Sequence, residues 1–293
     1  MTIEKYVLIT AAKNEERHIS NTIEAILAQT ILPTQWIIVS DGSIDHTDEI
    51  ALQYAGKCNF IKLIHKKETD TQCNFASKVY AICIGYNQLK DIDYQFIGHL
   101  DADISFKDDY YENVLERFRN NSRLGIAGGF IYEKRNNRFE SRPFNSIESV
   151  AGAIQLFRRE CYEAIGGLIP LKAGGEDWYA EVMARINGWE VVAFPELKVY
   201  HHKTGIKVRG ILKEGFRMGI MDYSLGIHPL LELTRCANRT RQKPFLLLGL
   251  TRLFGFLWSY YRRDKLLVSD DFIKYLRKEQ TATLKRIIKS AFG

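Results

Sequence analysis

The chain has 293 residues, of which 46% are hydrophobic and 26% are charged, and this composition is that of a folded globular protein. Its length allows one main domain with an appendage. The formal net charge of +6 is unevenly spread, because acidic residues are common up to about Glu196 whereas Lys and Arg dominate afterwards. Aromatic and basic residues do not interleave there as in a nucleic-acid-binding module, so a basic face toward anionic lipid is the better interpretation.

The cysteines and the apolar runs restrict the class of protein further. The five cysteines are odd in number, widely spread and without a CxxC pair, which argues against a disulfide framework and a structural zinc site. Residues 1–10 lack the layout of a signal peptide, and the apolar stretch over residues 245–261 is interrupted by Arg252. We therefore expect a cytoplasmic protein without a spanning helix, for which peripheral attachment to the inner face of the plasma membrane stays open.

Short apolar runs alternate with helical patterns in the first third of the chain. The predicted strands cover residues 6–10, 36–40, 60–65 and 95–100, and the predicted helices between them cover residues 16–29, 45–55 and 73–89. This order predicts an α/β fold with a Rossmann-like, mostly parallel sheet flanked by helices. Ligands of such sheets bind beyond the carboxyl ends of the strands, so the residues after each strand are the candidates for function.

Polar residues follow three of these predicted strands. They are Lys13-Asn14-Glu15, Asp41-Gly42-Ser43 and Asp101-Ala102-Asp103. Any one of them alone would be interpreted as a turn or a helix cap, but together they would lie at one edge of the sheet. The sequence has neither a GxGxxG motif after the first strand nor a GxxxxGK[ST] motif. A nucleotide at this edge would therefore have to be held by side chains and a metal ion.

The pair Asp101 and Asp103 is the candidate metal site. Side chains at positions i and i+2 of an extended segment share a face, so both carboxylates could reach one hard cation and its phosphate oxygens. The alternative is an Asx turn before the next helix. His201, after a predicted strand over residues 193–200, could complete the metal shell or be structural, and the neighbouring His202 leaves open which ring faces the metal.

Three further side chains are candidates for contacts with a nucleotide. The Asp41 carboxylate could accept hydrogen bonds from a base N–H or from ribose hydroxyls. Lys78 and Arg185 could each contact phosphate, or could merely pair with a carboxylate on a helix surface.

The segment Gly174-Gly175-Glu176-Asp177-Trp178 predicts a glycine turn that delivers carboxylates to the start of a helix. There Asp177 is the candidate general base, Glu176 a competitor for that role, and Trp178 a stacking face for a sugar. The alternative is a helix-terminal carboxylate that stabilises only the helix dipole, with Trp178 in the core.

These residues resemble the motifs of the family 2 glycosyltransferases, which are inverting enzymes of the GT-A fold. The matching pieces are TAAKNEE, DGSIDHT, LDADI, QLFRRECYEAIGGL, and GGEDW followed by Arg185, in the order of the family. The resemblance extends from about Tyr6 to His201. It implies a catalytic domain over residues 1–205, with a nucleotide-sugar half over about 1–103 and an acceptor half over about 104–205.

The resemblance also implies site residues and a reaction. The implied residues are Ala11, Glu15 and Asp41 at the nucleoside, Asp101 and Asp103 at the metal ion and diphosphate, His201 as a third metal ligand, and Asp177 as the base. The expected reaction is inverting transfer of a hexose-type sugar from a nucleotide sugar to a carbohydrate or lipid-linked acceptor, in polysaccharide or glycolipid synthesis. The expected metal is Mn²⁺ or Mg²⁺, and the donor is UDP-linked by default, with GDP- and dTDP-linked donors open.

Residues 206–293 form a predicted basic, amphipathic helical extension. Its helices could lie on an anionic membrane surface, cap the catalytic domain or form a homodimer interface. The rival functions are a sugar nucleotidyltransferase and a catalytically silent nucleotide-sugar-binding protein. A nucleotidyltransferase would need a glycine-rich basic loop to bind a triphosphate, and this sequence lacks such a loop. The presence of Asp103 and Asp177 argues against the silent protein.

Overall fold

The computed structural model describes residues 4–66, 76–135, 138–143, 145–203, 208–239 and 247–292. The chain divides into two compact units. The first unit contains Met1–Lys172 and Glu176–Gly205, and the second contains Ala173–Gly175 and Ile206–Gly293. Cys73 and the start of the helix predicted over residues 73–89 lie outside the described residues. The four described cysteines are free.

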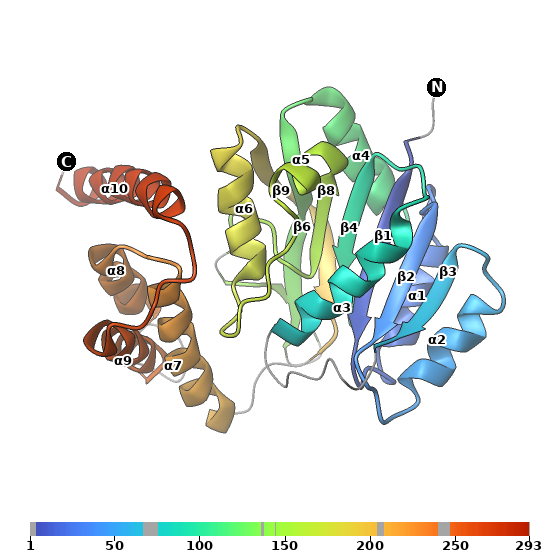
Figure 1. Ribbon diagram of the computed structural model, residues 1–293, viewed down its shortest axis with the longest axis horizontal. Coiled ribbons are helices and arrows are strands. Elements are labelled where there is room, and N and C mark those ends of the chain that lie inside the picture. The colour runs from blue at the N-terminus through green and yellow to red at the C-terminus, as the bar shows by residue number, and fades with distance from the viewer. Residues whose placement is uncertain are drawn as a thin grey trace. The chain divides into compact units, whose positions relative to one another are not determined.

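The first unit is a sheet with helices on both faces (Figure 1). Its strands are β1 Tyr6–Ala12, β2 Gln35–Ser40, β3 Ile61–His65, β4 Phe96–Leu100, β5 Ile104–Phe106, β6 Leu124–Arg135, β7 Arg138–Ser141, β8 Ile154–Arg158 and β9 Glu190–His201. Its helices are α1 Ile19–Leu27, α2 Thr47–Ala55, α3 Ala76–Tyr86 with a 3₁₀ turn at Asn87–Leu89, α4 Tyr110–Asn120, α5 Arg159–Ala164 and α6 Glu176–Ile186. The predicted α/β fold is therefore confirmed.

The strand order within the described residues is β3-β2-β1-β4-β8-β6-β9-β5, and β7 pairs with β6. The strands β1 to β4 are parallel to one another, as predicted from the alternation of strands and helices. Beyond β4 the sheet is mixed, because β8 runs antiparallel to both of its neighbours, β4 and β6. The strand β9 runs parallel to β6 and antiparallel to the short β5.

Alternate side chains of the parallel strands fill two cores. Tyr6 and Leu8 of β1 are buried with α1, α2 and α4, whereas Val7 and Ile9 are buried with α3, α5 and α6. Of these three helices, α3 and α5 lie in front of the strands in Figure 1. This explains why the strands are continuous apolar runs, since a sheet covered on both faces has no polar side. The carboxyl ends of β1, β2 and β4 lie at one edge of the sheet, where the polar segments follow.

The second unit consists of helices α7 Val208–Ser224, α8 Pro229–Arg239, α9 Leu247–Arg262 and α10 Asp270–Phe292, which confirms the predicted helical C-terminal region. The helices α7 and α9 pack closely at glycines: a Cβ added to Gly219 would clash with the backbone of Arg252. The buried Arg252 guanidinium donates to Glu232 at 2.9 Å and pairs with Asp222 at 2.6 Å. In the described part of the chain, we find no helix with the length and apolarity needed to cross a bilayer.

Candidate functional site

Asp41, directly after β2, belongs to a buried polar cluster. The Lys66 ammonium, at the end of β3, donates to Asp41 Oδ1 at 2.8 Å and to Ser77 Oγ at 2.9 Å. The Ser77 hydroxyl in α3 donates to Asp41 Oδ2 at 2.6 Å. Asp41 and Lys66 are 7% and 8% exposed, so both charges are held by this pairing and not by water. The sequence predicted Asp41 as a site residue but missed Lys66 and Ser77.

The loops after β1 and β2 are tied together beside this cluster. Asn14, which has a positive φ of 55°, accepts a hydrogen bond from the Ile44 N–H at 2.9 Å through its side chain. The backbone N–H of Glu15 donates to Thr47 Oγ1 at 2.7 Å. Ala11 lies within β1, opposite Val39 of β2. The residues implied for a nucleoside pocket, Ala11, Glu15 and Asp41, are therefore held on two adjacent, cross-linked strand ends.

The buried Asp103 pairs with the partly exposed His201. Because β5 and β9 are antiparallel with Ile104 opposite His201, the His201 ring reaches the neighbouring Asp103, and Nε2 lies 3.0 Å from Oδ2. The hydrogen bond to Asp103 raises the pKa of His201. Burial alone would raise the pKa of Asp103, but the His201 hydrogen bond and charge hold it below its usual value. His202 faces elsewhere, with its Nε2 2.7 Å from Ser105 Oγ.

Glu15 and Lys203 extend this group. The Lys203 ammonium donates to Glu15 Oε1 at 2.5 Å. Burial raises the pKa of Glu15, and the charges of Asp103 and Asp101 act in the same direction. The carboxylates of Glu15, Asp101 and Asp103 therefore lie near enough to influence one another. The sequence interpretation missed Lys203, which follows the double histidine.

Asp101 has a different partner from Asp103. Lys78 Nζ donates to Asp101 Oδ1 at 2.5 Å, whereas Asp103 faces His201. Residues 101–103 form a turn and not the extended segment on which a shared face was expected, so the two carboxylates diverge. Within the described ranges, no three His, Cys, Asp or Glu side chains are grouped so that they could hold a metal ion. Asp103 and His201 are thus the predicted metal ligands that the structure brings together.

The start of α6 carries the candidate base. Asp177 Oδ2 accepts a hydrogen bond from the Gly152 N–H at 3.1 Å, and Oδ1 accepts one from the Trp178 N–H at 2.8 Å. Burial raises the pKa of the neighbouring Glu176, and the charge of Asp177 adds to this effect. Asp177, Glu176 and Trp178 are all partly exposed. Asp177 is therefore held by two backbone amides while still open to solvent.

Lys78 lies near carboxylates from both of the predicted halves. Burial alone would lower its pKa, but the charges of Asp101, Glu176 and Asp177 raise it. Because charge interactions of this kind fall off with distance, Lys78 lies within reach of carboxylates from both halves. The residues predicted after the strands and the residues predicted at α6 therefore form one electrostatically coupled site. Arg185 lies two turns further along α6, where its charge acts on Glu181.

Comparison with known proteins identifies a family and several relatives. The family model described as Glycosyl transferase family 2 matches residues 7–175. The chain is 28% identical over 127 residues to the poly-beta-1,6-N-acetyl-D-glucosamine synthase of Staphylococcus epidermidis, covering 43% of this chain and 28% of that protein. It is 31% identical over 123 residues to the putative glycosyltransferase EpsH of Bacillus subtilis, covering 41% and 32%. The chain thus spans about a third or less of the length of these relatives.

Solved structures share the fold. The mannosyltransferase PcManGT from Pyrobaculum calidifontis, in complex with GDP-Man and Mn²⁺, has a TM-score of 0.57 at 14% identity, covering 97% of this chain and 81% of that one. The S. aureus TarS fragment 1–349, in complex with UDP-GlcNAc, has a TM-score of 0.54 at 16% identity, covering 93% and 78%. The fold likeness and a family match over more than half of the chain confirm the predicted family. The chain belongs to glycosyltransferase family 2.

Proposed function

We propose that this protein transfers a sugar from a nucleoside diphosphate sugar to an acceptor hydroxyl, with inversion at the anomeric carbon, in polysaccharide synthesis. The observation that carries the proposal is that carboxylates from both predicted halves lie around Lys78, which donates to Asp101 Oδ1 at 2.5 Å and whose pKa is raised by the charges of Asp101, Glu176 and Asp177. In a direct displacement, the acceptor oxygen attacks while the diphosphate leaves, so the donor and acceptor groups must lie close together. The matched relative that is a polysaccharide synthase supports the same class of product.

The donor nucleoside would lie against the cross-linked loops after β1 and β2. Asp41, buried with Lys66 and Ser77, retains acceptor capacity for a base N–H or for ribose hydroxyls. Ala11 and Glu15 would line the same pocket. UDP-linked donors are the first candidates because TarS was solved with UDP-GlcNAc, and GDP-linked donors are the second because PcManGT was solved with GDP-Man.

Asp103 and His201 would hold a divalent cation, since a carboxylate and an imidazole 3.0 Å apart can share one ion. Asp101 would join through its second oxygen or by way of the diphosphate, because Lys78 holds Oδ1. When bound, Mn²⁺ or Mg²⁺ would neutralise the charge that develops on the departing diphosphate. The complex of PcManGT with Mn²⁺ favours this assignment.

Asp177 would act as the general base. Its carboxylate would take the proton of the acceptor hydroxyl while that oxygen bonds to the anomeric carbon and the bond from this carbon to the diphosphate oxygen breaks. The attack comes from the side opposite the leaving group, so the anomeric centre inverts without a covalent sugar intermediate. Trp178 would offer a stacking face to the acceptor sugar, and Glu176 would contact the same sugar.

The test is turnover of a panel of nucleotide sugars, UDP-GlcNAc, UDP-glucose and GDP-mannose, with Mn²⁺. Release of the nucleoside diphosphate together with loss of activity in Asp177→Asn would support the proposal. A positioned base typically contributes about 10²- to 10⁴-fold in rate, while donor binding should survive the substitution. Release of pyrophosphate from a sugar phosphate and a nucleoside triphosphate would instead indicate a nucleotidyltransferase. Binding without turnover would indicate a silent binding protein.

The second unit would bring the protein to an anionic membrane surface where a lipid-linked acceptor could be met. One face of α9 exposes apolar side chains spaced three and four residues apart, namely Leu247, Leu250, Phe254, Leu257, Trp258 and Tyr261. The exposed Arg262, Arg263 and Lys265 follow at the end of α9. Aromatic side chains beside basic ones are typical of helices that lie in a membrane interface.

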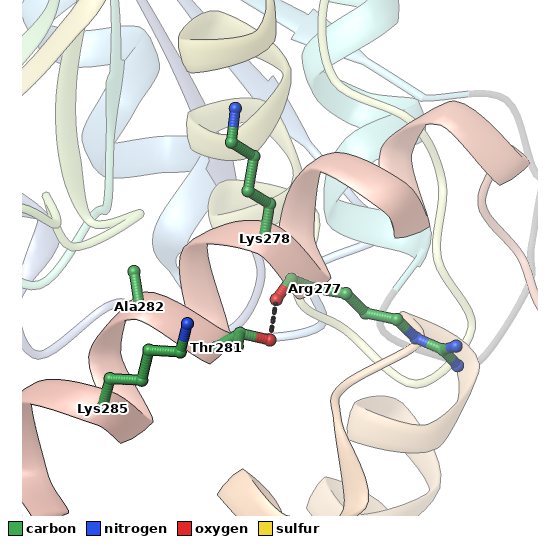
Figure 2. Close-up of a pocket in the computed structure, with 5 residues that line it drawn as sticks. All are labelled: Arg277, Lys278, Thr281, Ala282 and Lys285. Atoms are coloured by element: carbon green, nitrogen blue, oxygen red, sulfur yellow. Dashed lines mark hydrogen bonds between the residues drawn. The ribbon is translucent and has the colours of Figure 1, made fainter.

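The charge of this region favours an anionic partner over a second copy of the chain. Residues 206–293 contain 18 Lys and Arg against 7 Asp and Glu. A hollow of about 430 Å³ along α10 is lined by five residues, three of them basic, as Figure 2 shows. These residues are Arg277, Lys278, Thr281, Ala282 and Lys285. Two copies facing each other through such a surface would repel, whereas anionic lipid headgroups would be attracted. A homodimer is the alternative outcome of the test given below.

A further inference from the structure

The loop of residues 149–153 lies between the two halves of the site and is absent from the predicted site residues. Its Gly152 N–H donates to Asp177 Oδ2 at 3.1 Å. The next residue, Ala153, accepts a hydrogen bond from the Asp101 N–H at 2.9 Å through its carbonyl oxygen. Two adjacent residues of one loop therefore hold the candidate base and the donor-side aspartate.

Glu181, one turn after Asp177 on α6, anchors this loop through hydrogen bonds. Its Oε1 accepts hydrogen bonds from the Val150 N–H at 2.6 Å and from Ser149 Oγ at 3.2 Å. Gln155 Nε2 adds a bond to the Val150 carbonyl oxygen at 3.1 Å. Glu181, Val150 and Gln155 are each 1% exposed. A buried carboxyl on a helix is therefore used to fix backbone and not to contact substrate.

We infer that residues 149–153 are a positioning loop that sets Asp177 relative to Asp101, and that Glu181 and Gly152 are its positioning residues. This inference rests on the proposed role of Asp177 as the base. Transfer needs the acceptor oxygen, which Asp177 would deprotonate, to lie in line with the bond to the diphosphate held on the Asp101 side. A loop bonded to both residues fixes that separation, and misplacement of a reacting group by about 1 Å can cost roughly 10²-fold in rate.

Gly152 is required by the close approach of Asp177. A Cβ built on Gly152 would lie 2.7 Å from Asp177 Oδ2 and 2.8 Å from its Cβ, closer than side chains tolerate. Gly152→Ala must therefore displace the carboxylate without removing any polar group. Glycine at this position allows the loop amide to reach the base.

The raised pKa of Glu181 is consistent with an anchoring role. Burial raises its pKa to about 8, and the charge of Asp177 adds to this effect. A carboxyl that is neutral near pH 7 adds no second negative charge beside the base. Its Oε1 can still accept the loop N–H, because a neutral carboxyl keeps a carbonyl oxygen.

The experiment compares Gly152→Ala, Glu181→Leu and Glu181→Gln with the wild type, using whichever of UDP-GlcNAc and GDP-mannose with Mn²⁺ gives the faster wild-type release of nucleoside diphosphate. Gly152→Ala and Glu181→Leu should lower kcat by roughly tenfold to 10²-fold. Donor affinity, measured by calorimetry, should stay within about twofold. Glu181→Gln keeps an acceptor oxygen for Val150, so it should retain most of the rate. Gly56→Ala is the control, since its added methyl would meet only backbone oxygens at 3.6 Å and 3.8 Å.

The outcomes separate this inference from the proposed function. Wild-type kcat in both Gly152→Ala and Glu181→Leu, with an inactive Asp177→Asn, would overturn the positioning loop and leave the base in place. Near-normal transfer by Asp177→Asn would remove the base and the inference together. Equal losses of donor affinity and kcat would assign the loop a general structural role. Should Glu181→Leu fail to fold, the result with Gly152→Ala decides.

Discussion

Glu181 should make the free energy of unfolding depend on pH between about pH 5 and pH 8. Exposed carboxylates are already ionised in this range and contribute no such dependence. The pKa of Glu181 in the folded protein is raised to about 8 by burial, from a model-peptide value of 4.5. Between these values the folded protein keeps a proton that the unfolded chain releases, so stability is greatest at low pH and is lost as pH rises through this range. The neighbouring charges that contribute to this pKa are Asp177, which raises it, and Arg185, which lowers it.

The size of the effect follows from proton linkage. One proton of difference between the folded and unfolded states changes the free energy of unfolding by about 1.4 kcal/mol per pH unit. Between about pH 5 and pH 8, the contribution of Glu181 should therefore fall by about 4 kcal/mol. Glu181→Gln is neutral at every pH and keeps the acceptor oxygen, so it should remove this slope.

The measurement is urea unfolding of wild type and Glu181→Gln at pH 5, 6, 7 and 8. The free energy of unfolding of the variant, relative to wild type, should rise steadily with pH. The control is Glu163→Gln, which removes a half-exposed carboxylate paired with Arg159 and should follow the wild-type slope. A difference between Glu181→Gln and wild type that stays constant with pH would refute the argument, since Glu181 would then have the same charge in both states throughout.

Four further predictions concern the metal, the base and the helical unit. Asp103→Ala should abolish Mn²⁺-dependent donor binding and turnover while the fold stays intact by circular dichroism, and undiminished activity in a chelator would contradict this. His201→Ala should weaken Mn²⁺ affinity, measured by calorimetry, more than His202→Ala does, and a reversed ranking would exchange the two assignments. Glu176→Gln should keep most of the transfer rate, and its collapse beside an active Asp177→Asn would move the base to Glu176. The protein should float with anionic but not with neutral vesicles. Phe254→Ser should weaken this vesicle binding, whereas Leu52→Ser on α2 should not. A dimer in ultracentrifugation without flotation would favour the self-association alternative.

Much of the first unit could be predicted because its strands are buried on both faces. Such strands appear as unbroken apolar runs, and their ends are marked by the first polar residues, so Asp41 and Asp101 were found as strand-end residues. The strands β6 and β8 were not assigned from the sequence. They pair antiparallel with each other, and β8 also with β4, between segments distant in sequence, so no turn signal marks these pairings. The mixed half of the sheet depends on pairings that only tertiary contacts decide.

Two residues missed in the site have roles that depend on burial. Lys66 has the sequence context of an ordinary surface lysine, and Glu181 that of a solvent-facing helix position. Burial reverses each interpretation: Lys66 is held by Asp41 and Ser77, and Glu181 by the loop that it anchors. The positioning loop of residues 149–153 carries no recognisable motif, because its contribution is made by backbone N–H and C=O groups that every sequence possesses.

The choice between the two adjacent histidines shows why geometry was needed to propose a metal ligand. Successive residues of a strand point to opposite faces, so a shift of the β5–β9 register by one residue would turn the other ring toward Asp103. The observed register places Ile104 opposite His201, and the His202 N–H donates to the Asp103 carbonyl oxygen at 2.8 Å, which fixes that register at its end. The comparison of His201→Ala with His202→Ala therefore tests the sheet register as well as the proposed metal ligand.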